Sequence, residues 1–278
     1  MWHLKNIPKI LHTYWGGGKL LYLRYLTLES FHYYNPDWEI RFYYPKVTVY
    51  GGSWNGVEQK YTIRGDDWRP MIDPTVIKMI EVSWDEPVFK TMSEVHRSDY
   101  LRLKLLSEGG GLWADLDILF FRPIDNLAIN TPTNADKDTV VSIFTYGHSI
   151  GFMMASENNE AFRRLEQTAM RDYDPKIYQC MGSELYNKTF PTIESITNGV
   201  NLGMEAVYLY NCTQIKNILG DAPSPELNPN AIGTHWYAGS TMAGTFLYKT
   251  EGGEKPDDSL LGKLIQKYER DIHKDIQR

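Results

Sequence analysis

The N-terminal part of the chain alternates between two kinds of hydrophobic pattern. Residues 7–15 are largely apolar and predict a strand, which ends at a run of three glycines. Within residues 20–34 the apolar positions recur at helical spacing, and Pro36 would stop that helix. Apolar and polar side chains alternate again over residues 38–44, which predicts a second strand. Strand, helix and strand make a βαβ unit, so we expect a parallel sheet.

A second block of elements surrounds two aspartates. In residues 93–108 the leucines recur three and four positions apart, and three glycines follow, so we expect a long helix with a sharp stop. The apolar run 112–121 then predicts a strand that runs into Asp115 and Asp117 and continues beyond them. Further strands are expected at residues 140–144, 150–155, 206–210 and 232–237, and further helices at residues 160–170, 181–186 and 257–276.

Two segments have no clear hydrophobic period. Residues 45–75 are rich in Gly, Asp, Trp and Tyr, and we interpret them as a long loop or small hairpin insertion and a candidate acceptor loop. Residues 220–230 contain three prolines and predict a loop. We therefore expect one α/β domain over residues 1–245, with an amphipathic helix in residues 246–278 packed on the same domain.

The amino-acid composition favours a globular protein and argues against a nucleic-acid-binding protein. The 278 residues suit one large domain or two small ones, and the 42% hydrophobic and 23% charged fractions are ordinary for a globular protein. The net charge of −6 argues against a nucleic-acid partner, which usually requires a basic face. Aromatic residues make up 13% of the chain, and their faces either stack on sugars and nucleobases or simply fill the core.

The cellular setting follows from cysteine usage and hydropathy. Cys180 and Cys212 are expected to be reduced thiols, although one disulfide is compatible with the sequence. Sequons at Asn187 and Asn211 matter only in a secretory lumen. No apolar run approaches the ~18 residues of a membrane helix, and no signal-peptide core follows the N-terminus. We therefore expect a soluble, cytoplasmic protein.

The clearest candidate chemistry is the pair Asp115 and Asp117. Two carboxylates in so apolar a context are costly unless a partner or a metal offsets their desolvation. On an extended segment, residues two apart point the same way, so both carboxylates can face one cleft. Oxygen ligands suit Mg²⁺ or Mn²⁺, which would neutralise a leaving diphosphate. The alternative is a solvated turn, or aspartates that cap backbone N–H groups.

The preceding helix adds two more charges. Asp99 and Arg102 are three positions apart and share one helix face. The triple glycine returns the chain directly into the aspartate-bearing strand, so Asp99, Arg102, Asp115 and Asp117 are expected to lie close together. One interpretation is a single substrate site, and the other is a structural ion pair of Asp99 with Arg102 beneath the strand.

The sequence around these charges resembles a known family, the D-x-D sugar transferases of glycosyltransferase family 32, which include yeast-type mannosyltransferases and capsular transferases. It is similar also to the glucosylating domains of large clostridial toxins. The similar islands are residues 7–16 (IPKILHTYWG), 35–39 (NPDWE), 98–103 (SDYLRL), 109–117 (GGGLWADLD) and 151–156 (GFMMAS), with Gly182 and His235 further on. Their order and spacing over residues 7–240 make the resemblance specific.

The resemblance implies an α/β fold of GT-A type: a Rossmann-like mixed sheet flanked by helices, with helical additions. It also implies a nucleotide-sugar donor, Mn²⁺ or Mg²⁺, and retention at the anomeric carbon. Asp117 would bind the metal directly, Asp115 would touch the ribose or a metal-bound water, and His235 would complete the metal or diphosphate site. A lone histidine is more often structural, and only the position of His235 in the chain favours a ligand.

The same resemblance assigns the donor-binding residues. Asp99 and Arg102 would hold the hydroxyls of the donor sugar, Trp15 would stack on the nucleobase, and Trp113 would line the donor pocket. Ser240 is placed with them, in a segment expected to cover the donor phosphates. Trp15 at a strand end is equally compatible with a core position.

Two departures from the family pattern affect these expectations. Thr241-Met242 stands where the family often has a tryptophan after the serine, which puts the cover over the phosphates in doubt. Ser183 replaces the expected proline on the acceptor side.

The function that follows is transfer of a hexose from a UDP- or GDP-sugar to a glycan, a protein side chain or a lipid-linked acceptor. No residue is assignable as a nucleophile for a two-step covalent route, so a front-face displacement is expected. One alternative is a non-catalytic nucleotide-sugar- or glycan-binding protein of the same fold. Another is a metal-dependent phosphohydrolase, which predicts several more acidic or histidine ligands at strand ends.

Overall fold

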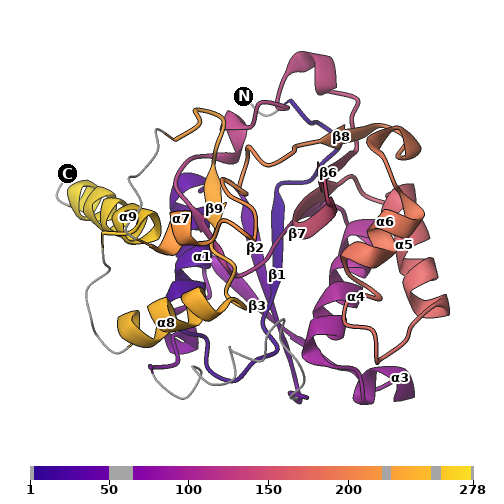
Figure 1. Ribbon diagram of the computed structural model, residues 1–278, viewed down its shortest axis with the longest axis horizontal. Helices are drawn as coiled ribbons and strands as arrows, with labels where there is room; N and C mark the ends of the chain where they lie inside the picture. Colours follow the sequence, from indigo (N-terminus) through magenta and orange to yellow (C-terminus); the bar gives the residue numbers. More distant parts are fainter. Residues whose placement is uncertain (1–2, 50–64, 221–226, 252–257, 277–278) are drawn as a thin grey trace.

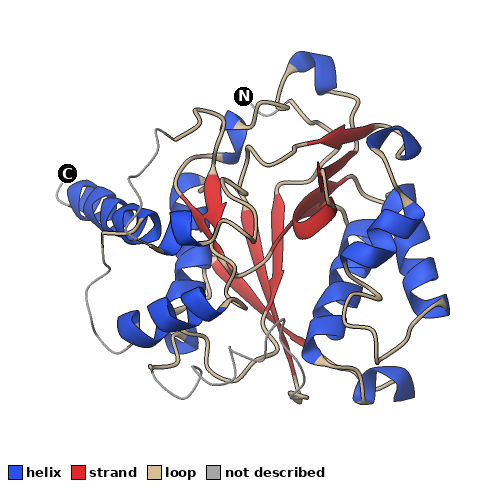
Figure 2. Ribbon diagram, viewed as in Figure 1, coloured by secondary structure: helices blue, strands red, loops and turns tan. Residues whose placement is uncertain are grey.

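The computed structural model describes residues 3–49, 65–220, 227–251 and 258–276 (Figure 1). A seven-stranded sheet runs through the middle of the molecule, with strand order β3-β2-β1-β4-β7-β6-β8. A separate pair, β5 and β9, forms a two-stranded sheet (red in Figure 2). The strands are β1 (Ile10–Tyr14), β2 (Glu39–Pro45), β3 (Ile77–Val82), β4 (Gly111–Ala114), β5 (Ile118–Phe120), β6 (Thr139–Phe144), β7 (Gly147–Ala155), β8 (Gly199–Asn201) and β9 (Gly233–His235).

The parallel half of the sheet confirms the predicted βαβ unit. Strand β1 pairs in parallel with β2 from Ile10 opposite Glu39 onward, and on its other side with β4. Strand β3 extends the parallel block beyond β2. All four residues of β4 are buried, as expected for a central parallel strand. Strands β7 and β6 then continue the sheet in antiparallel pairings, so the sheet is mixed.

Helices cover both faces of the sheet, as Figure 1 shows: α4, α5 and α6 lie on one side, and α1, α7, α8 and α9 on the other. The α-helices are α1 (Tyr22–Tyr34), α3 (Pro87–Lys90), α4 (Glu94–Glu108), α5 (Glu160–Arg171), α6 (Ser183–Thr189), α7 (Lys216–Leu219), α8 (Thr241–Thr250) and α9 (Leu260–Ile276). Short 3-10 turns occur at Arg69–Met71, Ile124–Asn126, Pro132–Asn134 and Ile193–Ser195. Apolar residues of α9 share one buried cluster with residues of α1 and α7, so the terminal helix packs on the same body.

The turn from α4 into β4 depends on glycine. Ser93 caps the start of α4, because its side chain accepts a hydrogen bond from the backbone N–H of His96. At the other end Gly110 and Gly111 have φ values of +62° and +101°. A Cβ on Gly110 would lie 2.4 Å from the backbone of Ser156, and so no other residue fits this approach. The glycine run therefore brings β4 directly back beside α4.

The structure corrects the expectation of a continuous strand at residues 112–121. Strand β4 ends at Ala114, the chain turns at Asp115 to Asp117, and β5 begins at Ile118 in the other sheet, paired with β9. The hydrophobic pattern is continuous because both strands are buried, and periodicity does not reveal which sheet a buried strand joins.

Other expectations hold in part. The predicted strand at residues 206–210 is wrong, because this segment forms turns in the interior. Strands β3 and β8 and helix α8 were not predicted; β3 has mostly exposed or half-buried residues, so its apolar pattern is weak. Of the expected insertion at 45–75, residues 50–64 lie outside the described residues, as do 221–226 of the proline-rich loop. No described helix has the length and apolar character needed to span a membrane.

Candidate active site

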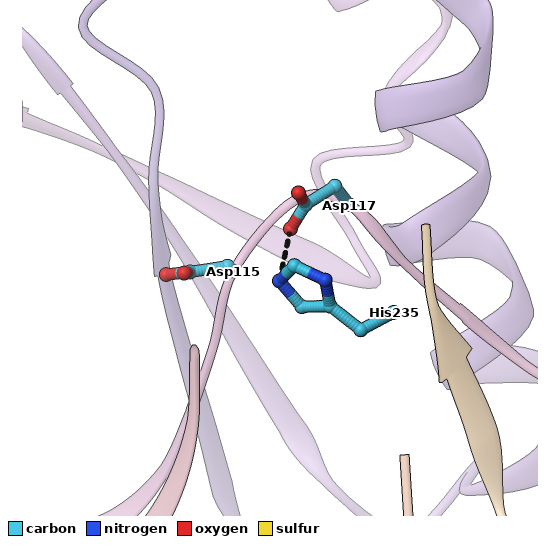
Figure 3. Close-up of side chains that lie close together, drawn as sticks. All are labelled: Asp115, Asp117 and His235. Atoms are coloured by element: carbon cyan, nitrogen blue, oxygen red, sulfur yellow. Dashed lines mark ion pairs between the residues drawn. The ribbon is translucent and has the colours of Figure 1, made fainter. Parts of the chain in front are cut away.

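The aspartate pair sits in the turn between β4 and β5. His235, at the end of β9, lies against the same turn, and Figure 3 shows His235 facing Asp117, with the side chain of Asp115 beside them. Oxygen and nitrogen atoms of Asp115, Asp117 and His235 all lie within 4.8 Å of one another. The turn, rather than an extended segment, brings both carboxylates to the same place. The side chain of Asp115 is 30% exposed, whereas those of Asp117 and His235 are 12% and 11% exposed.

Asp117 is held by the segment that follows β9. Its Oδ1 lies 3.1 Å from Nε2 of His235, and its Oδ2 accepts a hydrogen bond of 2.9 Å from the backbone N–H of Ala238. The backbone N–H of Trp236 also donates to the carbonyl oxygen of Asp117. Burial alone would raise the pKa of Asp117, but His235, Arg24 and the backbone N–H group of Ala238 together outweigh burial and bring this pKa to about 2. Asp117 is therefore an anion under all ordinary conditions.

His235 is fixed on both sides of its ring. The rings of Tyr208 and Tyr237 lie 5.2 Å and 4.4 Å away between centroids. The backbone N–H of Tyr237 donates to Nδ1 of His235 at 3.2 Å, so the proton of a neutral ring is on Nε2, facing Asp117. Burial lowers the pKa of His235, but the carboxylates of Asp117 and Asp115 together outweigh burial and raise it.

Tyr237 has an uncommon backbone conformation. Its φ of +52° lies in the left-handed region, where a non-glycine residue is strained. Its phenol donates a hydrogen bond of 2.7 Å to the carbonyl oxygen of Tyr210, which anchors the turn. This conformation lets the backbone N–H groups of Tyr237 and Ala238 reach His235 and Asp117 respectively.

The second half of the cluster comes from α4. Nη2 of Arg102 lies 2.9 Å from Oδ1 of Asp99 and 3.4 Å from Oδ1 of Asp115, and Nη1 donates to the carbonyl oxygen of Ile150 at 2.5 Å. The expected proximity of these charges is thus present. Burial raises the pKa of Asp99 to about 6; Arg102 opposes this shift and Asp115 adds to it.

Three further expected site residues have structural partners. Trp113 has no exposed surface, and its Nε1 donates to Oδ1 of Asp115 at 2.8 Å. Trp113 is therefore held against Asp115 by this hydrogen bond. Ser240 caps α8, because its Oγ accepts the backbone N–H of Ala243. Trp15 follows β1 and is half-buried, with its Nε1 bonded to the carbonyl oxygen of Lys19.

Sequence reasoning missed residues that come to the site from elsewhere. A Cβ added to Gly151, on β7, would lie 2.9 Å from both Oδ2 of Asp115 and the hydroxyl of Tyr208. Glycine at this position therefore lets β7 pass close to the aspartate turn. No local pattern distinguishes Gly151 or Tyr208; only pairing of β4 with β7 brings Gly151 here.

A further histidine, His12, contacts the glycine run that returns the chain into β4. His12 is buried, with Nδ1 within 3.0 Å of the Tyr43 hydroxyl and Nε2 within 3.0 Å of the Gly110 carbonyl oxygen. These contacts agree with a structural role. Cys180 and Cys212 are both free, as expected for reduced thiols.

A separate pocket of about 310 Å³ opens near the ends of β2 and β3. None of its lining residues belongs to the aspartate and histidine cluster. They are Lys46, Val47, Val49, Ser83, Trp84, Asp85, Lys90 and Arg97.

The cluster suits a hard divalent cation. Two carboxylates and one imidazole at this spacing are the mixed oxygen and nitrogen set that Mn²⁺ accepts, and Mg²⁺ would favour the carboxylates. Among the described residues this is the one group of three or more such side chains close enough to share an ion. The further strand-end ligands that a phosphohydrolase would need are therefore not seen in the described part of the chain.

Residues 25–134 match the family model of the glycosyltransferase sugar-binding region containing a DXD motif. No curated protein matches the chain in sequence. Among solved structures, the glycosyltransferase GlyE of Streptococcus pneumoniae TIGR4 superposes with a TM-score of 0.50 at 12% identity, over 94% of this chain and 60% of GlyE.

Two further solved structures similar to this chain are also glycosyltransferases. The PaToxG glycosyltransferase has a TM-score of 0.46 and 16% identity, over 68% of this chain and 71% of its own. The galactosyltransferase LgtC, solved with donor and acceptor sugar analogues, has a TM-score of 0.40 and 14% identity, over 87% of this chain and 95% of its own. The superposition on GlyE supports a mixed α/β fold of GT-A type for this chain, and the aspartate turn lies within residues 25–134, which match the DXD family model.

Proposed function

We propose that the protein is a metal-dependent, retaining glycosyltransferase that moves a hexose from a UDP- or GDP-sugar to a hydroxyl acceptor. The observation that carries the proposal is the convergence of Asp115, Asp117 and His235 at the carboxyl end of β4, beside the buried pair Asp99 and Arg102. In an open α/β sheet, this end of the strands is where ligands bind.

Asp115, Asp117 and His235 are proposed to hold Mn²⁺ or Mg²⁺, which when bound neutralises charge on the leaving diphosphate. Asp117 is permanently ionised and rigidly held, and Asp115 is the more exposed of the two carboxylates. For His235 to act as a ligand through Nε2, its proton has to move to Nδ1, and the hydrogen bond from Tyr237 is then lost.

Asp99 and Arg102 are proposed to bind hydroxyls of the donor sugar. Arg102 is shared between Asp99 and Asp115, so it connects the proposed sugar site to the aspartate turn. Held in this way, the sugar would present to the acceptor the same face from which the diphosphate leaves. The departing phosphate oxygen would help to remove the acceptor proton, and the anomeric configuration would be retained.

The rest of the proposed donor site is formed by Trp15, Trp113 and Ser240. Trp15 stands at the end of β1 with its N–H group bonded to Lys19 and is proposed to stack on the nucleobase. Trp113 supports Asp115 from behind, and Ser240 begins α8 next to the segment that holds Asp117. The acceptor is proposed to be a glycan, a protein side chain or a lipid-linked sugar, and the protein to act in glycan biosynthesis in the cytoplasm.

A panel of UDP- and GDP-sugars with Mn²⁺ tests this proposal through slow donor hydrolysis, which needs no acceptor. One donor should release its nucleoside diphosphate only when metal is present. Asp117→Ala should abolish the release while the protein remains folded, and Asp172→Ala should not, because Asp172 forms an exposed ion pair with Lys188 away from the cluster. Donor binding without any release, even with candidate acceptors, would instead favour a non-catalytic sugar-binding protein.

A further inference from the structure

A buried arginine, Arg24, lies between the two ends of the proposed donor site. It is in the first turn of α1 and is only 5% exposed. It lies just before the residues that match the sugar-transferase model, which begin at residue 25. Arginine is almost never buried without a specific partner, so its neighbours indicate why the fold keeps it there.

The guanidinium group of Arg24 stacks on Trp15. Its Cζ lies 4.0 Å from the centre of the indole ring, well inside the range of a cation–π contact. The edge of the same indole is covered by the backbone of Gly17, where a Cβ would come within 2.4 Å of Cζ2. With Nε1 bonded to the carbonyl oxygen of Lys19, the ring of Trp15 is fixed at one face, one edge and its N–H group.

The same guanidinium group also lies near the metal side of the site. Its Cζ is 5.8 Å from the ring centre of Trp236, the residue that directly follows His235. The backbone N–H group of Trp236 donates a hydrogen bond of 2.9 Å to the carbonyl oxygen of Asp117. Arg24 thus contacts both the indole proposed for the base and the residue that links His235 to the aspartate turn.

We propose that Arg24 is a positioning residue of the donor site, which fixes Trp15 as a platform for the nucleobase and supplies positive charge behind the diphosphate. This inference rests on the proposed function. The competing explanation is a purely structural role. Arg24 also interacts electrostatically with Glu251, which lies outside the proposed donor site. The two explanations differ in whether Arg24 changes affinity for nucleotides or only the stability of the fold.

Two substitutions separate the roles of shape and charge. Arg24→Met keeps an apolar side chain of similar length but removes the charge, whereas Arg24→Lys keeps the charge and loses the planar stack. The probes are UDP, GDP, uridine and guanosine, titrated with Mn²⁺ present and followed by calorimetry, with thermal melting as the control for folding. Arg164→Met is a matched control. Arg164 is on α5, outside the site, and its Cζ lies 5.2 Å from the ring centre of Phe190.

The expected result is a loss of affinity for whichever diphosphate binds wild-type protein, of about tenfold in Arg24→Met and less in Arg24→Lys. Affinity for the matching nucleoside should fall several-fold in both variants, because both lose the stack. The additional loss in Arg24→Met should appear only with the diphosphate and should shrink at high salt, since it comes from charge. Arg164→Met should bind like wild type.

Folded Arg24→Met and Arg24→Lys variants that bind the diphosphate as wild type does would overturn the role of Arg24 while leaving the proposed function intact. If Arg24→Met does not fold, Arg24→Lys alone decides, because unchanged affinity for the nucleoside would exclude the platform role. Wild-type protein that binds neither UDP nor GDP would overturn the proposed function itself, and with it this inference.

Discussion

The two halves of the candidate site hold their carboxylates in opposite ways. Asp99, on α4, is buried beside Arg102 and has its pKa raised to about 6. Asp117, after β4, is buried beside His235 and has its pKa lowered to about 2. Burial raises the pKa of both carboxyls above the ordinary value of 3.8; at Asp99 the effect of burial prevails over Arg102, whereas at Asp117 the partners together outweigh burial.

The difference has a structural origin. Arg102 divides its charge between Asp99 and Asp115, so neither carboxylate is fully compensated. Asp117 contacts the imidazole of His235 and the backbone N–H group of Ala238, and both belong to the segment at the end of β9. In the half built on α4, the carboxyl of Asp99 therefore changes its protonation near pH 6. In the half built on β9, Asp117 stays ionised. A sugar hydroxyl and a metal ion respectively are the ligands suited to these two environments.

Removal of the shared cation should have the largest effect on stability. Arg102→Met leaves Asp99 and Asp115 without their common partner in a buried setting, so the free energy of unfolding should fall by about 3–5 kcal/mol. Urea denaturation at pH 7 measures this loss. Arg171→Met, which removes an exposed ion pair with Asp172, should change stability by less than about 1 kcal/mol. Equal losses in the two variants would remove the distinction between the α4 half and an ordinary surface pair.

The opposite pKa shifts should appear as opposite pH dependences of stability. Because the folded protein holds the Asp99 proton more tightly, the contribution of Asp99 to stability is complete below pH 3.8 and is lost as the pH rises through about 6, by about 3 kcal/mol in total. The contribution of Asp117 is present above pH 3.8 and is lost as the pH falls towards 2.

Denaturation of wild type, Asp99→Asn and Asp117→Asn across this pH range tests both signs. Subtraction of the Asp99→Asn curve from the wild-type curve should leave a difference that declines between pH 4 and 6. The corresponding difference for Asp117→Asn should rise with pH below 4. Differences with the same sign would show that the two carboxylates are not held in opposite ways.

A substitution at Gly151, beside Asp115, is expected to have a smaller effect on stability. Gly151→Ala places a methyl group 2.9 Å from Oδ2 of Asp115 and from the Tyr208 hydroxyl, so these two side-chain groups must move. Overpacking of this kind costs about 1–3 kcal/mol, and the displacement of Asp115 should weaken metal binding as well. Thermal melting and Mn²⁺ titration measure the two consequences, and Gly18→Ala, where nothing lies within 4 Å, is the matched control. Unchanged metal affinity in folded Gly151→Ala would show that Asp115 does not contribute to the ion site.

The smallest predicted effect concerns the turn that holds His235. Tyr237→Phe removes only the hydrogen bond to the carbonyl oxygen of Tyr210, which should cost about 1 kcal/mol. The strained φ of +52° would then be less firmly held, so hydrogen exchange at residues 236–238 should accelerate. Exchange as slow as in wild type would mean that packing around the rings, and not the phenol anchor, maintains this turn.

Local sequence was sufficient to predict the α4 half of the site. Asp99 and Arg102 share a helix face, and the glycine run returns the chain beside them, so their proximity to Asp115 follows from short-range geometry. The β9 half could not be obtained in this way. More than a hundred residues separate Asp117 from His235, and only resemblance to a family placed His235 at the site.

The limits of the fold prediction have a similar cause. The βαβ unit and the long helices were predictable because their hydrophobic periods are local. The division of residues 112–121 between two sheets was not, since β4 and β5 are both fully buried and differ only in their long-range partners. Arg24, Gly151 and Tyr208 carry no local signal either, and tertiary packing alone brings them to the aspartates.

The central claim is that Asp117, with Asp115 and His235, holds a divalent cation for a nucleotide-sugar diphosphate. Electron paramagnetic resonance of Mn²⁺ tests it most directly, by counting ions bound to wild type and to Asp117→Asn at equal protein concentration. The account predicts one site in wild type, tightened by UDP or GDP, and no such site in the folded Asp117→Asn variant. Equal Mn²⁺ binding by the two proteins would contradict it.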